Sequence, residues 1–383
     1  MDSLLTIEQK RELLHRGFSR RNLGRMASLL TAGAALPFFN EPALAQLSKV
    51  GPIPADAVKI NANENPLGPC PEAAEAIYSV VKKGGRYLYE ETDAFAQTLA
   101  NVEGVKKEYI LPYPGSSAPL HQAVLAFTSP TKSFVVGDPG YEAGAMAAKF
   151  IGSKVIRVPL TKDYKHDVKA MVAADPNAGL IYICNPNNPT GTITPKEDIE
   201  YVIKNKPAGS ILLLDEAYIH LSKSAEPGTY LVAADKDVII LRTFSKLYGM
   251  AGLRAGAAIG RPDLLEKIRP YSAGALPVTG MVGANASLKV KSLVPERRQI
   301  IANVREDVFS YLHKNNFDFV PSESNKFMVN VKRPGGEVVK AMMGEKVYIG
   351  RVWPAWPTYV RVSIGTQEEM NKFKTAFSKV MSA

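Results

Sequence analysis

Six short apolar runs, separated by stretches of helical periodicity, constrain the fold of this chain most strongly. The runs are rich in Val, Ile and Leu and nearly unbroken, which is typical of strands covered on both faces. Their alternation with helices predicts an α/β fold with a mostly parallel, doubly wound sheet. The predicted strands cover residues 133–136, 154–158, 180–184, 210–214, 238–241 and 255–259.

Polar residues follow three of these predicted strands. Asn185, Asp215 and Thr243 each stand just past a strand end. Ligands of doubly wound sheets bind beyond the carboxyl ends of the strands, so we expect these three positions to share one binding edge. Each position opens a polar motif, and the motifs are Asn185-Pro186-Asn187-Asn188, Asp215-Glu216-Ala217-Tyr218 and Thr243-Phe244-Ser245-Lys246.

The side chains in these motifs are those that bind pyridoxal 5′-phosphate (PLP). Lys246 offers an amine for an aldimine with the cofactor and, once released by substrate, a base that moves a proton. Asp215 offers a carboxylate that keeps the ring nitrogen protonated, so that the ring acts as an electron sink. Donors for the ring phenolate and ligands for the phosphate are offered by Asn188 and Tyr218, and by Ser245 and Arg254.

Two further segments fit the same cofactor. Gly115-Ser116-Ser117 forms a turn before the apolar helical stretch 120–127, and the N–H groups at a helix start bind phosphate. Tyr141 is a candidate for stacking on the pyridine ring. Simpler interpretations stay open for single motifs: a strand-end cap for Asp215, core packing for Tyr218 and an ordinary helix cap for the Gly-Ser turn.

Two arginines near the end of the chain are candidates for substrate binding. Arg361 lies inside an alternating strand pattern, residues 359–364, and its guanidinium suits a carboxylate or phosphate. Arg351 stands ten residues earlier and is the second candidate. An ion pair on the surface is the alternative for each.

Charge and cysteine content exclude other classes of function. The net charge is +10, but the lysines are dispersed and no basic stripe with interleaved aromatic residues is present, so nucleic-acid binding is not expected. Cys70 and Cys184 lie far apart in the sequence and form no metal-type pair, so we expect no metal.

The first 45 residues resemble a twin-arginine signal peptide. Arg20-Arg21 is followed by the uncharged stretch 26–39, and Ala43-Leu44-Ala45 gives the small-x-small pattern of a leader-peptidase site. The resemblance predicts export through the twin-arginine translocase, to the periplasm or the exterior. The apolar stretch is too short for a comfortable membrane span. An N-terminal amphipathic helix with a chance Arg pair is the alternative.

The rest of the chain is expected to form two domains. Residues 46–85 form an N-terminal arm and part of a small domain. Residues 86–273 hold the predicted strands and form a large PLP-binding domain. Residues 274–383 turn helical and then strand-like at 327–331 and 359–364, which predicts a smaller C-terminal α/β domain.

Together these motifs resemble the fold-type I PLP aminotransferases of class I and II, most closely the histidinol-phosphate aminotransferase group. The similarity runs from Asn63-Glu64-Asn65-Pro66-Leu67-Gly68-Pro69 to Arg361-Val362-Ser363-Ile364-Gly365-Thr366. It implies an enzyme that moves an amino group from a small-molecule donor to a 2-oxo acid acceptor. It also implies a homodimer with shared active sites, in which Tyr87 reaches the phosphate of the neighbouring subunit.

The resemblance assigns a role to each motif. It makes Lys246 the aldimine lysine, Asp215 the partner of the ring nitrogen and Tyr141 the stacking residue. Arg361 falls on the arginine that binds the substrate's anionic group. The phenolate ligands are then Asn188 and Tyr218, and the phosphate site follows the Gly115 turn and is formed by Ser116, Ser117, Thr243, Ser245 and Arg254.

Three positions depart from the pattern of the group. Ala118 stands where an acidic residue is frequent, and Leu247 follows the lysine where a small residue is common. The loop 352–357 between the two arginines is compact and holds both tryptophans, Trp353 and Trp356. We therefore expect a preference for aromatic or large apolar amino acids over histidinol phosphate. Packing of the tryptophans in the core of the small domain is the alternative.

Three other functions share these residues. A PLP-dependent decarboxylase or lyase would use every cofactor ligand named above, because only the orientation of the bonds at the substrate carbon separates it from an aminotransferase. A true histidinol-phosphate aminotransferase is the second alternative, and an exported, non-catalytic binding protein is the third.

Overall fold

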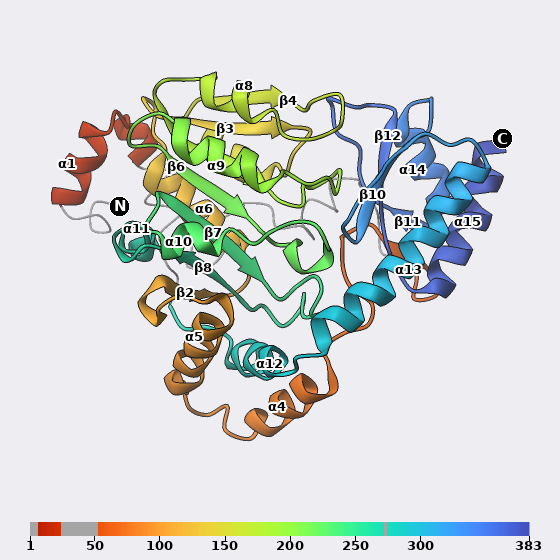
Figure 1. The fold of residues 1–383 in the computed structure, drawn as a ribbon, viewed down its shortest axis with the longest axis horizontal. Coiled ribbons are helices and arrows are strands. Elements are labelled where there is room, and N and C mark those ends of the chain that lie inside the picture. The colour runs from red at the N-terminus through yellow and green to blue at the C-terminus, as the bar shows by residue number, and fades with distance from the viewer. Residues whose placement is uncertain (1–6, 24–52, 272–273, 383) are drawn as a thin grey trace.

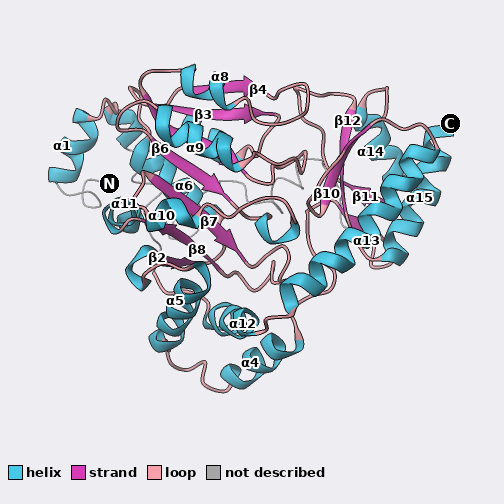
Figure 2. Ribbon diagram, in the orientation of Figure 1, coloured by secondary structure: helices cyan, strands magenta, loops and turns pink. Residues whose placement is uncertain are grey.

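The protein folds around a seven-stranded sheet with helices on both faces (Figures 1 and 2). The computed structural model describes residues 7–23, 53–271 and 274–382. The strand order is β2-β8-β7-β6-β5-β3-β4, and all neighbours pair in parallel except at β8, which runs antiparallel to β2 and β7. The strands are β2 (Ile110–Tyr113), β3 (Ser133–Asp138), β4 (Val155–Pro159), β5 (Ala178–Cys184), β6 (Ile211–Asp215), β7 (Val238–Thr243) and β8 (Gly256–Gly260).

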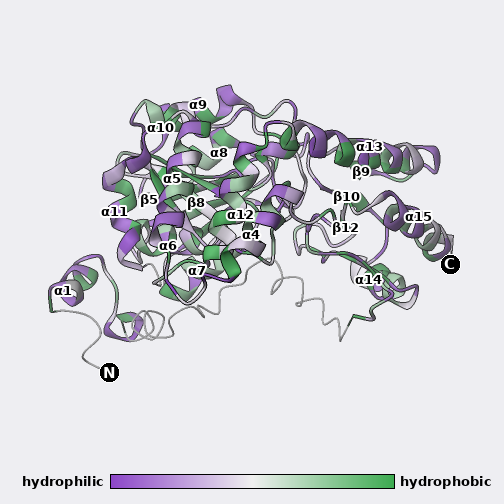
Figure 3. Cartoon of the chain, turned by 90° about the horizontal axis from the view of Figure 1, so that it is seen from below, coloured by the Kyte–Doolittle hydropathy of each residue, from purple (hydrophilic) through white to green (hydrophobic). Residues whose placement is uncertain are grey.

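The predicted α/β fold with a mostly parallel sheet is confirmed. Strands β5, β6, β7 and β8 are buried along their whole length, which explains why their sequences are unbroken apolar runs. Helices α8 (Val168–Ala173), α9 (Lys196–Asn205) and α10 (Thr229–Ala233) lie on one face of the sheet (Figures 1 and 3). Helices α6 (Ser117–Phe127) and α7 (Ala143–Ile151) lie on the other, and α11 (Pro262–Ile268) contacts α6.

Strand β2 was not expected from the sequence. It has four residues, and Pro112 within it lacks the N–H that a central strand needs. The strand lies at the edge of the sheet and pairs with β8 alone, a position where proline is tolerated. Because the strand is short and contains a proline, its sequence does not show the pattern typical of a strand.

A second group of strands and helices is built from the N-terminal arm and the C-terminal part of the chain. An antiparallel sheet has the order β12-β10-β9, and β1 from the N-terminal arm pairs in parallel with β11. These strands are β1 (Val58–Ile60), β9 (Phe319–Val320), β10 (Lys326–Asn330), β11 (Val347–Ile349) and β12 (Tyr359–Ser363). The accompanying helices are α13 (Leu293–Lys314), α14 (Gly335–Gly344) and α15 (Gln367–Ser382).

Three helices pack beside one edge of the large sheet. Helix α12 (Val278–Lys289) contacts both α4 (Pro71–Val81) and α5 (Tyr89–Glu103). Helix α13 then runs from the end of α12 to the second group of strands (Figure 1). Within the described ranges, no helix is both long and apolar enough to cross a membrane.

The N-terminal residues around the Arg pair pack on the helices of the large sheet. Helix α1 (Ile7–His15) is followed by a turn in which Arg16 donates to carbonyl oxygens at the C-terminal end of α6, at 2.7 to 3.1 Å, where the helix dipole favours a cation. Leu13, Phe18 and Leu23 are buried in the main hydrophobic core. The uncharged stretch 26–39 and the expected cleavage site lie outside the described residues.

Candidate active site

A cavity of about 230 Å³ opens at the carboxyl ends of the parallel strands. It is lined by residues from the ends of β5, β6 and β7, from the start of α6 and from the N-terminal arm. The structure therefore brings together segments that are far apart in the sequence. Ten of the predicted site residues line it: Ser116, Ser117, Tyr141, Asn188, Asp215, Tyr218, Thr243, Ser245, Lys246 and Arg254.

Asp215 is the last residue of β6 and is only 3% exposed. The Tyr182 hydroxyl donates to its Oδ2 at 2.8 Å, and the backbone N–H of Ala217 donates to Oδ1 at 3.1 Å. Burial raises the pKa of Asp215, while these hydrogen bonds and the charges of Lys326 and Lys246 oppose the rise. The carboxylate is thus costly to ionise and is stabilised by a cationic partner.

Lys246 lies on the loop after β7 and is also buried. Its Nζ donates to the carbonyl oxygen of Ala62 at 3.4 Å and lies 5.6 Å from the centre of the Tyr218 ring. The preceding Thr243 and Ser245 form a turn in which the Thr243 hydroxyl donates to Ser245 Oγ at 2.9 Å. The amine therefore shares the cavity with a carboxylate, a phenol and a hydroxyl pair.

Arg254 and the turn before α6 form a site for an anion. Arg254 Nη1 donates to Ser245 Oγ at 3.3 Å, and Nη2 donates to the carbonyl oxygen of Pro114 at 2.8 Å. Gly115 has a φ of +96°, and a Cβ there would lie 2.4 Å from Arg254 Nη2, so this approach requires glycine. Helix α6 begins at Ser117, and Ser116 and Ser117 line the same cavity as Arg254, so a helix start lies beside the guanidinium.

A hydrogen-bond network links this cavity to β12. Arg361 is fully buried on β12, and its Nη1 donates to Asn188 Oδ1 at 3.0 Å. Asn63, whose φ is +54°, donates through Nδ2 to the Tyr218 hydroxyl at 3.0 Å and to Asn188 Oδ1 at 3.5 Å. Asn63 opens the motif 63–69, but nothing in the sequence pattern predicted its positive φ or a role in this network.

Arg351 lies apart from this cavity. It lines a second cavity of about 610 Å³, where its Nη2 pairs with Glu142 Oε2 at 2.7 Å. Trp353 lies between the two arginines: its ring centre is 4.6 Å from the Arg351 guanidinium carbon and 5.4 Å from that of Arg361. The Trp353 indole N–H donates to the carbonyl oxygen of Gly140 at 2.9 Å. No sequence pattern predicted that Glu142 would pair with Arg351.

The two tryptophans differ in their surroundings. Trp353 is 1% exposed and packs with Val320 and Met328. Trp356 contacts the rings of Tyr164 and Tyr359, at centroid distances of 5.6 and 5.1 Å. Trp353 thus combines core packing with a place beside both arginines.

Tyr87 is not among the residues that line either cavity. Its side chain is 73% exposed and stacks on Tyr89 at a centroid distance of 5.6 Å. Within one chain, Tyr87 therefore does not line the cavity that holds the predicted phosphate ligands.

Comparison with known proteins identifies the class. Residues 55–377 match the family described as Aminotransferase class I and II. The chain is 32% identical over 339 residues to the histidinol-phosphate aminotransferase of Moorella thermoacetica, covering 85% of this chain and 86% of the relative. It is 30% identical over 333 residues to the aromatic amino acid aminotransferase of Cutibacterium acnes, covering 85% and 93%. The chain belongs to the class I and II aminotransferases.

The fold agrees with that assignment. The crystal structure of histidinol-phosphate aminotransferase from Sinorhizobium meliloti in complex with pyridoxal-5′-phosphate matches with a TM-score of 0.78 and 25% identity, covering 90% of this chain and 95% of that one. The protein is therefore a fold-type I, PLP-dependent aminotransferase. The prediction of transamination is confirmed, and the decarboxylase or lyase alternative is not favoured.

Proposed function

We propose that PLP binds in the 230 Å³ cavity with its ring nitrogen at Asp215 and its phosphate at Arg254. The chemistry of the lining supports this orientation. A buried carboxylate whose pKa is raised by burial suits a protonated ring nitrogen, because opposite charges stabilise each other most where water is excluded. A guanidinium at a helix start suits a phosphate. The remaining phosphate ligands are the hydroxyls of Ser116, Ser117, Thr243 and Ser245.

The residues around the cavity have separate roles in transamination. Bound PLP supplies the sink for the electrons of the bond that breaks at the substrate carbon. Lys246 holds the cofactor through its Nζ, is displaced by the amino substrate and then moves a proton at the substrate carbon. Asp215 keeps a proton on the ring nitrogen. Asn188 and Tyr218 donate to the ring oxygen, and Arg361 orients the substrate carboxylate.

Release of products tests this reaction directly. The holoenzyme mixed with an amino donor should release the matching 2-oxo acid, and the amino group should reappear on an added 2-oxo acid acceptor. Release of carbon dioxide in place of the 2-oxo acid would contradict transamination.

We propose that the amino substrate carries an aromatic or large apolar side chain. The observation that carries this proposal is the ion pair of Arg351 with Glu142, whose side chains are 6% and 16% exposed. A phosphate that approached Arg351 would also approach the Glu142 carboxylate, and like charges in a buried site disfavour binding. Trp353 and Val352 add apolar surface beside the pair.

Histidinol phosphate is the second candidate, because several relatives carry that name. Values of kcat/KM for phenylalanine, histidinol phosphate and aspartate separate the two. We expect phenylalanine to be preferred, and Glu142→Gln to raise kcat/KM for histidinol phosphate by roughly tenfold or more, because a like charge is removed. Glu337→Gln, at an exposed position on α14, is the matched control. A clear preference of the wild type for histidinol phosphate or aspartate would overturn the proposal.

We propose further that the protein is a homodimer in which Tyr87 completes the partner's phosphate site. Exposed large apolar side chains gather on the stretch that contains Tyr87, and such patches mark interaction surfaces. The position of Tyr87 away from the cavity of its own chain supports a role across an interface. The exposed side chains are Leu67, Tyr78, Val81, Tyr87 and Tyr89.

Mixed dimers test this arrangement. Tyr87→Ala and Lys246→Ala should each lack most activity as separate dimers. After mixing and reassembly, one site of each mixed dimer combines Lys246 of one subunit with Tyr87 of the other, so part of the activity should return. Absence of any recovery in verified mixed dimers would contradict a shared site.

We propose export by the twin-arginine route. Arg20 and Arg21 are both exposed, whereas the flanking Phe18 and Leu23 are buried, so the Arg pair is accessible while the cofactor domain is folded. A cofactor inserted in the cytoplasm requires export in the folded state. Replacing both arginines by lysine should leave a folded, full-length holoenzyme in the cytoplasmic fraction. A wild-type protein that keeps its N-terminus and stays in that fraction would contradict the proposal.

A further inference from the structure

A second buried lysine, Lys326, lies beside the cofactor cavity. It is the first residue of β10, and its side chain is 0% exposed. Its Nζ lies 3.1 Å from the centre of the Tyr218 ring, closer than the 5.6 Å of Lys246 Nζ. A cation over an aromatic ring is stabilised by the ring's electrons. The sequence pattern gave Lys326 no role, because the strand was expected to begin at the next residue.

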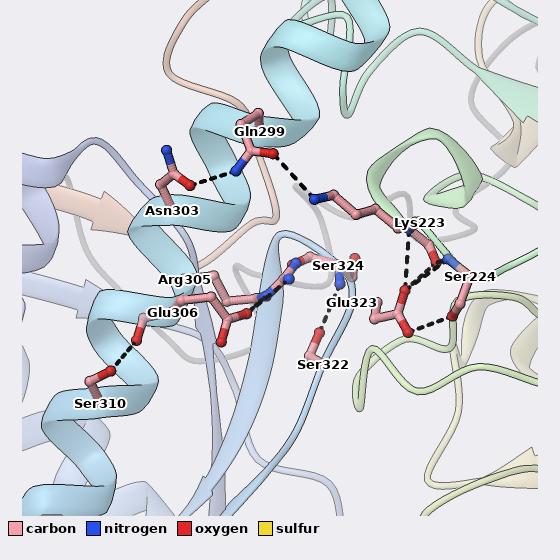
Figure 4. A network of polar contacts seen from close by, with 11 residues as sticks. Lys223, Ser224, Gln299, Asn303, Arg305, Glu306, Ser310, Ser322, Glu323 and Ser324 are labelled. Atoms are coloured by element: carbon pink, nitrogen blue, oxygen red, sulfur yellow. Dashed lines mark hydrogen bonds and ion pairs between the residues drawn. The ribbon is translucent and has the colours of Figure 1, made fainter.

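The segment before Lys326 is anchored on two sides. Lys326 Nζ donates to Ser324 Oγ at 2.9 Å, and Arg305 on α13 donates to the carbonyl oxygen of Ser324 at 3.3 Å. The neighbouring Glu323 accepts from the Ser224 hydroxyl at 2.5 Å, as Figure 4 shows. These contacts tie the segment both to α13 and to the chain that follows Tyr218.

A hydrogen-bond network on the neighbouring strand β12 also reaches Tyr218. In the β10–β12 register Lys326 stands opposite Ser363. The Ser363 hydroxyl donates to Asn63 Oδ1 at 3.0 Å, and Asn63 donates to the Tyr218 hydroxyl. The Tyr218 phenol is thus hydrogen-bonded to Asn63, whose partner Ser363 stands opposite Lys326 on the neighbouring strand.

The ammonium acts on the acids at this end of the cavity. Burial raises the pKa of both Asp215 and Cys184, and the charge of Lys326 opposes the rise in each. The other charged or titratable groups on the elements packed around it are Tyr182 on β5, Tyr218 after β6, Lys246 after β7, Arg361 on β12 and Arg305 on α13.

We propose that Lys326 is a positioning residue that sets the charge balance of the cofactor site through Tyr218 and Asp215. This rests on the PLP site proposed above. A nearby cation favours the deprotonated form of any acid, whether the acid is neutral or cationic, and burial preserves the effect. With Lys326 in place, a proton on Lys246 Nζ would therefore be lost at a lower pH than beside a neutral side chain, and bound PLP would report that loss through its absorbance.

The pH dependence of the visible absorbance of the holoenzyme measures this effect. Lys326→Met and Lys326→Gln should both raise the midpoint of the titration by about one pH unit. Lys326→Arg keeps the charge and should keep the midpoint near that of the wild type. Lys340→Met, at an exposed position on α14, is the matched control and should not change it. The melting temperature of each apoprotein reports separately on folding.

Each outcome decides the question. Equal midpoints in the wild type, Lys326→Met and Lys326→Gln would overturn the proposal, as would a shift that Lys326→Arg shares. If both neutral variants fail to fold while Lys326→Arg folds, the charge serves folding rather than the cofactor, and the proposal also falls. A wild type that binds no chromophore would instead contradict the PLP site itself.

Discussion

Asp215→Asn separates the charge of the buried carboxylate from its shape. Asparagine has nearly the same size. Its oxygen can accept from the Ala217 N–H, which now donates to Oδ1 at 3.1 Å, and its NH2 group can donate to the Tyr182 hydroxyl, which now donates to Oδ2 at 2.8 Å. The cavity should therefore keep its form and continue to bind PLP. The lost element is a negative charge at a position that is 3% exposed.

The size of the loss follows from that burial. Two opposite unit charges about 4 Å apart attract by about 4 kcal/mol in a protein environment of effective dielectric constant about 20, against about 1 kcal/mol in water. The difference corresponds to roughly two pKa units for the ring nitrogen. If turnover follows the protonated fraction of the ring, kcat should fall by about 100-fold.

Whereas kcat should fall, the stability of the apoprotein should stay the same or rise. Burial raises the pKa of Asp215 in the folded protein, so its ionised form costs stability at any pH above the ordinary pKa of an aspartate. Removing the charge relieves this cost. At pH 8, the melting temperature of the Asp215→Asn apoprotein should therefore equal or exceed that of the wild type.

Three measurements test both expectations, the loss of turnover and the unchanged or higher stability of the apoprotein. They are kcat at saturating donor, the dissociation constant of PLP from fluorescence, and the melting temperature of the apoprotein. Asp163→Asn makes the same substitution at an exposed position and should leave all three unchanged. Near-normal kcat in Asp215→Asn, or an apoprotein that melts well below the wild type, would refute the reasoning.

The remaining predictions concern covalent attachment and stability. Borohydride reduction of the holoenzyme should fix the cofactor to Lys246, and Lys246→Ala should abolish turnover; a label mapped to another lysine would contradict the assignment. Arg242→Met leaves two buried glutamates without their cation and should lower the free energy of unfolding by about 3–5 kcal/mol, measured by urea denaturation; an unchanged midpoint would argue against a buried ion pair. Burial lowers the pKa of His166 and His220 from 6.5 to about 4, so the unfolded chain gains protons first and the melting temperature should fall as the pH drops below about 6.5; a constant melting temperature down to pH 5 would contradict this.

The sequence located the cavity because the residues that line it stand where elements end. Asp215 follows an apolar run that can only be a buried strand, and Thr243 follows another. Parallel strands direct such positions to one edge, so local patterns were sufficient to group them. The turn at Gly115 was readable for the same reason, because a helix start is a local feature.

The roles of residues that act through partners distant in the sequence could not be predicted from the sequence. Tyr182 lies in the middle of an apolar strand, where it looks like core, yet its hydroxyl donates to Asp215. Lys326 precedes the strand predicted at 327–331, where a lysine is ordinarily exposed, yet it is the first residue of β10 and is buried against the Tyr218 ring. In both cases the function of the side chain depends on pairing between strands, which no local pattern contains.

Substrate choice depends on such pairs more than cofactor binding does. A guanidinium in isolation predicts an anion, and Arg351 was predicted to bind one for that reason. Glu142, from the start of α7, converts the same side chain into half of a neutral pair, so the charge that a substrate meets belongs to the pair. Arg361 instead donates to the neutral oxygens of Asn188 and Asn61. On the substrate proposed above, the Arg351–Glu142 pair and the Trp353 ring, which lies near both guanidinium groups, would face an apolar side chain, and Arg361 would bind the single carboxylate.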